Sequence, residues 1–205
     1  MYIPKHFKID DLEIIYNIIE KNSFATLFSQ HNGRPYATHL PLLLEKEEGV
    51  LYGHFARPNE HWKDIENQTV LVTFQGPHAY ISPSWYESIQ AVPTWNYVAV
   101  HVYGQVEILH EEQEIYDALF SMVDKYEKPG SSYRFKEIDR NFIDGMSKGI
   151  VAFRIKITEI EGKAKLSQNH SVERQDLVIK QLELSQESDQ LQIAKLMKKN
   201  HKKEC

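Results

Sequence analysis

The segment from Val70 to Gly104 combines aromatic and hydrogen-bonding side chains more densely than an ordinary core requires. Aromatic walls with a few convergent polar groups are what a pocket for a flat organic ligand needs, so we expect function to be concentrated here. The residues concerned are His78, Tyr80, Ser82, Ser84, Trp85, Trp95, Asn96 and His101. An equally good interpretation of the aromatic members is a core or a subunit interface, where aromatic residues also dominate.

A candidate phosphate site follows at Gly53 to Asn59, which ends one expected strand and begins a short helix. Arg57 lies beside the helix start, where a guanidinium and exposed backbone N–H groups together favour a phosphate. Such a charge-assisted contact contributes about 1.5–3 kcal/mol. The alternative is a surface arginine beside the turn at Pro58.

Two further segments contain weaker signals. Pro35 to Pro41 is unusual for a strand because Pro41 has no N–H, so we expect an edge strand, whose spare backbone groups could also bind a ligand. Glu161 to Ser171 is expected to be a polar loop, or a donor-rich lip over an anionic ligand. Its donors are Lys163, Lys165, Ser167, Gln168 and Asn169.

The ten histidines do not show the close spacing typical of a zinc or iron site, so we predict no metal centre. The sequence also contains no P-loop, no GxGxxG after a strand, no HExxH and no GxSxG. The basic end of the chain is expected to be solvated, although docking on a partner or a nucleic acid stays open. Its lysines are Lys195, Lys198, Lys199, Lys202 and Lys203.

Composition limits the functional class. The 205 residues suffice for one sizeable core, and a net charge of −5 offers no electrostatic footprint for DNA or anionic membranes. The single cysteine, Cys205, excludes an internal disulfide. We expect neither a signal peptide nor a membrane span, and therefore a soluble cytoplasmic protein.

The expected elements place these residues on strands and loops. Asp10 should cap a first helix that runs to Asn22, with Glu13 completing a capping box. The pair Asn32-Gly33 predicts a tight hairpin turn. Asn59 should cap a helix between Arg57 and Asn67. Expected strands cover 24–29, 35–44, 50–56, 70–74, 79–81, 94–109 and 150–160, and expected helices cover 111–126, 136–148 and the chain from 171 onward.

This order predicts a mainly antiparallel β fold with helices. The first three strands, joined by short turns, predict a meander. Later strands separated by helices indicate a small β-barrel decorated by helices. We expect residues 1–170 to form the barrel domain, with inserted helices at 111–148, and residues 171–205 to form a helical extension.

Six motifs, taken in order, resemble the PaiB family of FMN-binding negative transcriptional regulators. The resemblance spans Met1 to about Leu182, and its motifs are MYIPKHF, ATHLPLLL, GHFARPNEHW, FQGPHAYISPSWY, VPTWNYVAVHVYG and GKAKLSQN. It implies the FMN-binding split β-barrel shared with pyridoxamine-phosphate oxidases and a homodimer with flavin at the subunit interface. It also implies repression of sporulation and degradative-enzyme (protease) genes.

The same resemblance implies the site residues. Arg57 would bind the FMN phosphate with His54 and Ala56 beside it, although flavin proteins of this fold often have Ser and Lys where Ala56 and Pro58 stand. Thr38 and His39 fall at the isoalloxazine edge. His101 stands near a position that is often arginine in the oxidases, which argues against pyridoxamine-phosphate oxidase activity.

The second subunit would complete the site. The resemblance implies that it contributes Trp95 and Asn96, and the cofactor-binding set ends with Lys165 and Ser167. Two other functions stay open beside the regulator: an FMN-dependent oxidoreductase that affects regulation indirectly, and a haem-binding split-barrel protein. The negative charge and the absence of a DNA-reading motif favour the oxidoreductase over direct DNA contact.

Overall fold

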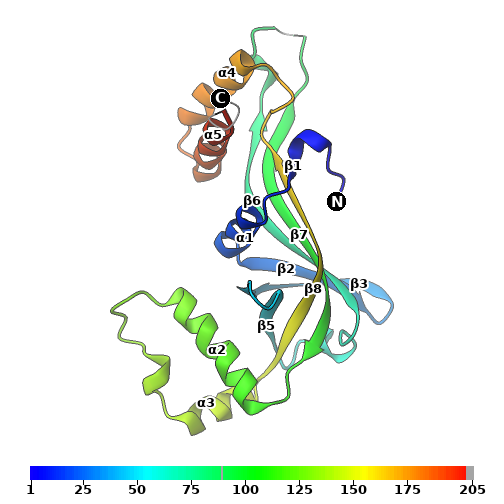
Figure 1. The fold of residues 1–205 in the computed structure, drawn as a ribbon, viewed down its shortest axis with the longest axis vertical. Helices are drawn as coiled ribbons and strands as arrows, with labels where there is room; N and C mark the ends of the chain where they lie inside the picture. The colour runs from blue at the N-terminus through cyan, green and yellow to red at the C-terminus, as the bar shows by residue number, and fades with distance from the viewer. Residues whose placement is uncertain (89, 202–205) are drawn as a thin grey trace. The chain divides into compact units, whose positions relative to one another are not determined.

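A computed structural model describes residues 1–88 and 90–201 of the chain (Figure 1). Cys205 and the lysines Lys202 and Lys203 lie outside the described residues. The strands are β1 (Lys8–Ile9), β2 (Phe24–His31), β3 (Arg34–Pro41), β4 (Leu43–Glu45), β5 (Val50–Ala56), β6 (Thr69–Ile81), β7 (Thr94–Ile108) and β8 (Ile150–Lys165).

The α-helices fall into three groups along the chain: one between β1 and β2, two between β7 and β8, and two after β8. The α-helices are α1 (Leu12–Lys21), α2 (Glu112–Tyr126), α3 (Arg140–Ser147), α4 (Val172–Glu183) and α5 (Ser188–His201). Four short 3-10 helices are η1 (Lys5–Phe7), η2 (Glu60–Lys63), η3 (Pro83–Trp85) and η4 (Phe135–Glu137). None of the described helices combines the length and the apolar character that crossing a membrane requires.

The strands form one sheet in the order β3-β2-β6-β7-β8-β5-β4, with β1 paired to β8. The pairings β1–β8, β2–β3, β2–β6, β4–β5 and β5–β8 are antiparallel, which confirms the predicted class. The Asn32-Gly33 hairpin between β2 and β3 is also confirmed, because both residues have positive φ, 52° and 69°. β3 lies at the end of the strand order, as expected for a strand that ends in proline.

The chain forms two compact units, each assembled from separate stretches. We call them the terminal unit (residues 1–18, 75–100 and 161–201) and the central unit (residues 19–74 and 101–160). β6, β7 and β8 each contribute one stretch to both units.

The core of the central unit comes from alternate residues of its strands. Phe55 of β5 stacks on Phe153 of β8, with ring centroids 4.7 Å apart. Both are fully buried, as are Leu27, Val72 and Phe74 from β2 and β6. Burying a large apolar side chain contributes roughly 1.5–3 kcal/mol, so this cluster is a main source of the unit's stability.

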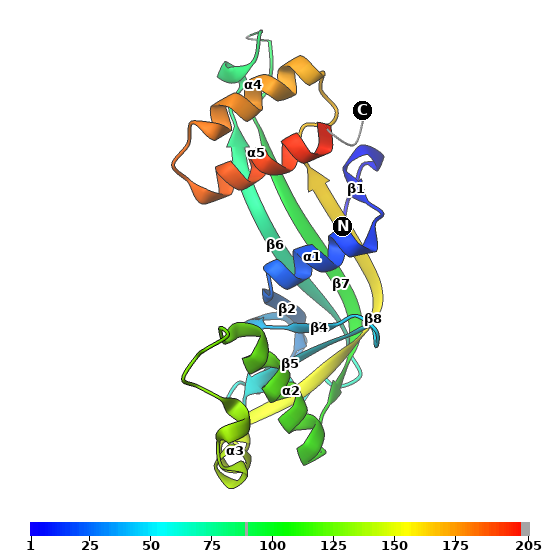
Figure 2. The ribbon, with the colours of Figure 1, turned by 60° about the vertical axis from the view of Figure 1, so that its left-hand side comes forward.

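The terminal unit has its own core, beneath α4 and α5, which lie side by side (Figure 2). Ile81 of β6 is fully buried in the same cluster as Leu182 of α4 and Ile193 of α5. The two C-terminal helices therefore contribute to the core of this unit.

Three expectations about local structure are wrong. Asp11, not Asp10, caps α1, because its Oδ1 accepts from the backbone N–H groups of Glu13 and Ile14 at 3.0 and 3.3 Å. The helix expected between residues 57 and 67 is only the 3-10 helix η2, although Asn59 does cap it through the N–H of His61. The segment 136–148 contains η4 and then α3, which starts at an Asp139 cap.

Two expectations about strands hold only in part. The expected strand 35–44 divides into β3, which pairs with β2, and β4, which pairs with β5. The segments do not form one continuous meander, because β3 and β4 lie at opposite ends of the strand order. The expected polar loop at 161–171 is too long, because β8 continues to Lys165. Lys163 is therefore a buried strand residue whose Nζ donates to the carbonyl of Tyr2 at 3.0 Å, and not part of an open lip.

We expect Gly104→Ala to destabilise the protein by about 1–3 kcal/mol, since an added methyl group in a filled core forces the backbone to shift. A Cβ at this position of β7 would collide with the Lys156 carbonyl and lie 2.5 Å from the Ile155 side chain. The matched control is Gly145→Ala in α3, where no atom lies within 4 Å. It should stabilise by roughly 0.5–1 kcal/mol, because alanine is the better helix former. Urea unfolding midpoints measure both, and an unchanged midpoint for Gly104→Ala would show that the two strands are not so close.

Candidate functional site

Arg57, the predicted phosphate ligand, directly follows β5 and holds the loop before β8 in place. Its Nε donates to the carbonyl of Lys148 and its Nη2 to that of Ile150, both at 2.6 Å. Its guanidinium also lies 5.9 Å from the ring centroid of Trp62. Two of its three nitrogens therefore serve backbone carbonyls, which leaves Nη1 for a phosphate.

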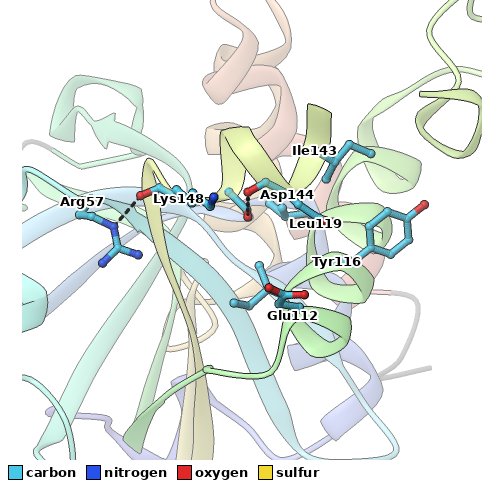
Figure 3. A pocket seen from close by; sticks show the side chains of 9 residues that line it. Arg57, Glu112, Tyr116, Leu119, Ile143, Asp144 and Lys148 are labelled. Atoms are coloured by element: carbon cyan, nitrogen blue, oxygen red, sulfur yellow. Dashed lines mark hydrogen bonds between the residues drawn. The ribbon is translucent and has the colours of Figure 1, made fainter. Parts of the chain in front are cut away.

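A cavity of about 160 Å³ lies beside Arg57 (Figure 3). Its lining includes Leu119 and Tyr116 of α2 and Asp144 of α3. Asp144 accepts from Arg140 Nε at 2.9 Å, and the Arg140 guanidinium lies 3.9 Å from the Tyr116 ring centroid. Small-molecule pockets usually measure about 300–1,000 Å³, so this cavity alone cannot enclose a flavin.

A buried histidine forms the polar centre of the central unit. His61 of η2 is fully buried, and its ring nitrogens contact Ser29 Oγ of β2 at 2.6 Å and Thr38 Oγ1 of β3 at 2.8 Å. Asn59 Nδ2 donates to Thr38 Oγ1 at 3.2 Å, and Asn59 Oδ1 accepts from the backbone N–H of His61. Thr38, a predicted flavin contact, is thus part of an internal network.

The donors of this network run in one direction. Asn59 donates to Thr38, whose hydroxyl is then free to donate to His61 Nδ1. Ser29 Oγ donates to the Gln30 carbonyl at 3.4 Å and can at the same time accept from His61 Nε2. In this arrangement the imidazole proton is on Nε2, and both nitrogens of the neutral ring have partners.

The environment of His61 opposes its protonation. Burial, and to a lesser extent the charge of His31, lowers the pKa of His61 from 6.5 to about 4, while Asp64 acts in the opposite direction. Asp64 itself accepts from His31 Nδ1 at 2.8 Å. His61 is therefore a neutral structural histidine at physiological pH, not a general base that exchanges protons near neutrality.

The outward face of the β2–β3 hairpin is apolar and exposed. Phe24 is 71% and Phe28 is 39% exposed, and β2–β3 pairing places Phe24 opposite Pro41 and Phe28 opposite Ala37. Between them, Thr26 Oγ1 contacts His39 Nδ1 at 2.9 Å. His39, the second predicted flavin contact of β3, therefore stands on an open apolar face.

The other predicted residues of the central unit lie on β5 and β7. His54 is half-buried, and burial lowers its pKa. Ala56 is exposed at the end of β5, next to Arg57. His101 is half-buried on β7.

The four predicted residues of the terminal unit come together in two pairs. Lys165 Nζ donates to the backbone carbonyl of Trp95 at 2.7 Å, and the Trp95 ring itself is 52% exposed. Asn96 and Ser167 are both buried, and Asn96 Nδ2 donates to Ser167 Oγ at 3.0 Å. Asn96 also contacts Met197 Sδ of α5 at 3.6 Å, so this pair joins β7 to the helical core.

The density of aromatic residues in 70–104 has two structural outcomes. Trp85 and Tyr86 pack against the core beneath α4 and α5. Trp95 and Tyr80 instead form an exposed edge-to-face pair with centroids 5.9 Å apart. Within residues 1–88 and 90–201, no three His, Cys, Asp or Glu side chains are grouped so as to hold a metal ion.

Comparison with known proteins assigns the family. The family model described as "Putative FMN-binding domain" matches residues 1–159. A Bacillus subtilis (strain 168) protein named "Protease synthase and sporulation protein PAI 2" is 43% identical over 208 residues that cover all of both chains. The chain belongs to this family. An uncharacterised Saccharomyces cerevisiae protein is 32% identical over 155 residues, which are 62% of this chain and 91% of that protein.

Solved structures confirm the fold. A conserved hypothetical protein from Mycobacterium tuberculosis superposes with a TM-score of 0.61 at 15% identity, over 83% of this chain and 96% of that one. The flavocytochrome Anf3 from Azotobacter vinelandii gives a TM-score of 0.59 at 16% identity, over 80% and 72%. At such identities the likeness is evidence for the fold alone, and the family's fold is the predicted split β-barrel.

The roles of His61 and Ser29 were not predicted from the sequence. His61 was considered only as one of ten histidines, and Ser29 only as the last residue of an expected strand. A signal was present, because Asn59 caps η2 through His61 and so places the imidazole against the preceding strands. The register of β2 against β3 was needed to see which hydroxyl groups meet it.

We expect acid to destabilise the protein through His61. Since its pKa is about 4 when folded and 6.5 when unfolded, the unfolded chain gains a proton first as pH falls through this window. The free energy of unfolding should then drop by up to about 3 kcal/mol between pH 6.5 and pH 4. His61→Gln should be less stable at pH 7 but show a shallower slope, which His54 and His170 keep above zero because their pKa values are also lowered.

Urea titrations at half-unit pH intervals measure this slope. The matched control is His110→Gln, which removes an exposed histidine and should leave the slope unchanged. Equal slopes for wild type and His61→Gln would show that the buried imidazole is not the titrating group.

Proposed function

We propose that this protein is a PaiB-type FMN-binding regulator that acts in the cytoplasm as a negative regulator of sporulation and of protease synthesis. The observation that carries this proposal is the full-length, 43% identical match to the Bacillus subtilis protein, whose name refers to protease synthase and sporulation. The family model supports the cofactor. When bound, FMN supplies reversible one- and two-electron redox chemistry.

Arg57 is the proposed phosphate ligand of this site. It is exposed at the end of β5, and the Lys148 and Ile150 carbonyls fix its guanidinium with Nη1 left over. A guanidinium that is already immobilised loses little side-chain entropy on binding. Ala56 allows close approach beside it, and half-buried His54 is its nearest polar neighbour along β5.

The exposed hairpin face is the proposed wall for the isoalloxazine ring. Phe24, Phe28 and His39 offer apolar and aromatic surface there, next to the edge strand β3. Half-buried Thr38 takes no direct part, because its hydroxyl is hydrogen-bonded to His61. His39 keeps Nε2 for a polar group of the ring, since its Nδ1 faces Thr26.

A second copy of the chain completes the site in this proposal. The 160 Å³ cavity beside Arg57 is too small for a flavin, and the apolar hairpin face has the character of a subunit interface. Exposed Trp95 would then reach the flavin from the second subunit, with Asn96 holding its strand from behind. In such a dimer, the redox state of FMN would bias the subunit arrangement, and through it gene expression.

The regulatory and enzymatic forms of the proposal differ in what must be measured. A net charge of −5 argues for an indirect effect on transcription, through a redox reaction or a protein partner. FMN-dependent consumption of NADH or NADPH by the purified protein would support the oxidoreductase. Protection of promoter DNA would support direct repression.

We expect FMN to bind with one molecule per subunit and Arg57→Ala to weaken binding at least about tenfold, since a charge-assisted phosphate contact is lost. Flavin fluorescence and absorbance titrations measure this affinity. Arg134→Ala is the matched control, because it removes an exposed arginine whose ion pair, among the described residues, is with neighbouring Glu137. Equal affinity for wild type and Arg57→Ala would place the phosphate elsewhere, and no binding at high micromolar FMN would contradict the cofactor.

We expect Phe24→Glu to separate the dimer and to lose FMN binding at the same time, because a charge on the hairpin face cannot be buried against its copy. Sedimentation velocity measures the oligomeric state across concentrations. Phe142→Glu is the control, since Phe142 is also an exposed phenylalanine, at 62%, but lies on the helix α3 and not on the β2–β3 hairpin. A Phe24→Glu dimer with wild-type FMN affinity would remove this face from the proposal.

A further inference from the structure

A second cavity, of about 310 Å³, lies within the terminal unit. Its wall comes from the segment between β6 and β7, the end of β8 and the first turn of α4. The residues that give it chemical character are Phe7, Tyr86, Thr94, Lys165, His170 and Arg174. None of them belongs to the central unit, where the flavin contacts on β3 and β5 lie.

One positive charge of the cavity, that of Lys165, has no carboxylate partner among residues 1–88 and 90–201. Lys165 Nζ donates to Thr94 Oγ1 and to the carbonyl of Trp95, and both acceptors are neutral. Arg174 is neutralised by Glu87, to which its Nε donates at 3.0 Å. The net charge of these groups is therefore about +1, which matches a monoanion.

A hydrogen-bond donor in the same wall is unused. The hydroxyl of Tyr86 is buried, and no described residue accepts from it or donates to it. Its ring is fixed between two basic groups, with the Arg174 guanidinium 4.7 Å and the His170 ring 5.8 Å from its centroid. A buried polar group without a partner costs about 1–3 kcal/mol, and a ligand that accepts this hydrogen bond would recover that cost once a shift of the Tyr86 side chain brings the buried hydroxyl to the cavity surface.

Titration of the lining groups indicates the same positive potential. Burial, followed by the charges of Arg174 and Lys165, holds the pKa of His170 below its ordinary value, with Glu87 opposing. Burial and Lys163 lower the pKa of Lys165. A bound anion would oppose the contributions of these positive neighbours to the two pKa values, although not the contribution of burial.

The rest of the wall is apolar and suits one ring. Phe7, Ala91 and Val92 line the cavity together with the face of Tyr86, and Lys165 Nζ lies 5.9 Å from the Phe7 centroid. A volume of 310 Å³ is at the lower end of the range of about 300–1,000 Å³ for small-molecule pockets. This favours a compact ligand with a single aromatic or branched apolar body.

We propose that this cavity binds a small organic monocarboxylate, with its carboxylate between Lys165, Arg174 and the Tyr86 hydroxyl and its apolar body against Phe7. The site shares no residue with the flavin contacts proposed on β3 and β5, although the family resemblance placed Lys165 and Ser167 in the cofactor-binding set, and it does not rest on flavin binding. Glu87 pairs with Arg174 in this structure, so the ligand competes with a carboxylate of the chain itself. The segment that contains Glu87 is thereby coupled to ligand binding.

The test uses the full-length protein and two matched probes, 4-fluorobenzoate and the neutral 4-fluorobenzamide, followed by fluorine NMR. The benzoate should bind saturably and at least about tenfold more tightly than the amide, because only it can neutralise the half-buried charge of Lys165. Equal affinities for the two probes, or no binding of the benzoate, would overturn the proposal. Stronger binding of inorganic phosphate than of benzoate would also overturn it, in favour of an oxyanion site.

Three variants identify the contacts. Lys165→Met should weaken benzoate binding at least about tenfold, and Tyr86→Phe at least about threefold. Tyr86→Phe removes a hydroxyl that bonds no described residue, so it should fold normally and keep the test valid if Lys165→Met does not fold. Glu87→Gln should tighten binding about two- to fivefold, since it removes the competing carboxylate from Arg174. Unchanged affinity in Tyr86→Phe and Glu87→Gln would contradict the assignment.

A competition arm separates this site from the flavin site. FMN should not displace 4-fluorobenzoate, and the benzoate affinity should be the same with and without saturating FMN. Displacement by FMN would place the flavin in this cavity and overturn the proposal of a separate site. Failure of FMN to bind at all would leave the benzoate result standing.

Discussion

The buried imidazole of His61 is the constraint around which the central unit is arranged. A polar ring inside a core is tolerated only when each of its nitrogens has a partner, and here Ser29 and Thr38 supply both. These hydroxyl groups lie on adjacent strands and on the same face, and a slip of the β2–β3 register by one residue would turn one of them away. The network therefore specifies the hairpin register, and with it which side chains point outward.

The outward face follows from that inward requirement. Since Ser29 and Thr38 must point inward, Phe28 and His39 point outward. The exposed phenylalanines of β2 are therefore a consequence of strand geometry. Because successive side chains point to opposite faces, Phe28 must point outward when Ser29 points inward to His61. A surface made in this way needs a cover, and this is why the hairpin face is the natural place for a second subunit or a flat ligand.

Much of the fold was readable from the sequence because it depends on local signals. Asn32-Gly33 requires positive φ, and the run from Val50 to Ala56 has the composition of a strand, so both were predicted at their observed positions. The local pairing of β5 was also readable, since β4 lies at the end of the expected strand 35–44. Pairing between distant segments was not readable, because β5 joins β8 across about a hundred residues and no local signal indicates this. The extension of β8 to Lys165 was missed for a similar reason, since Lys163 has a partner, Tyr2, at the other end of the chain.

Residue types in the candidate sites were predictable, but the use of each donor was not. Arg57 and Lys165 look alike in the sequence, as basic residues near strand ends with polar neighbours. In the structure, two nitrogens of Arg57 donate to backbone carbonyls, and Lys165 also donates to a carbonyl. Both residues line a cavity, but only the cavity of Lys165 has beside it a buried hydroxyl without a partner among the described residues. A bound anion contributes most where the charge and the donors that meet it are both uncompensated. By that criterion the cavity of the terminal unit is better prepared for an anionic ligand than the arginine to which the family resemblance pointed.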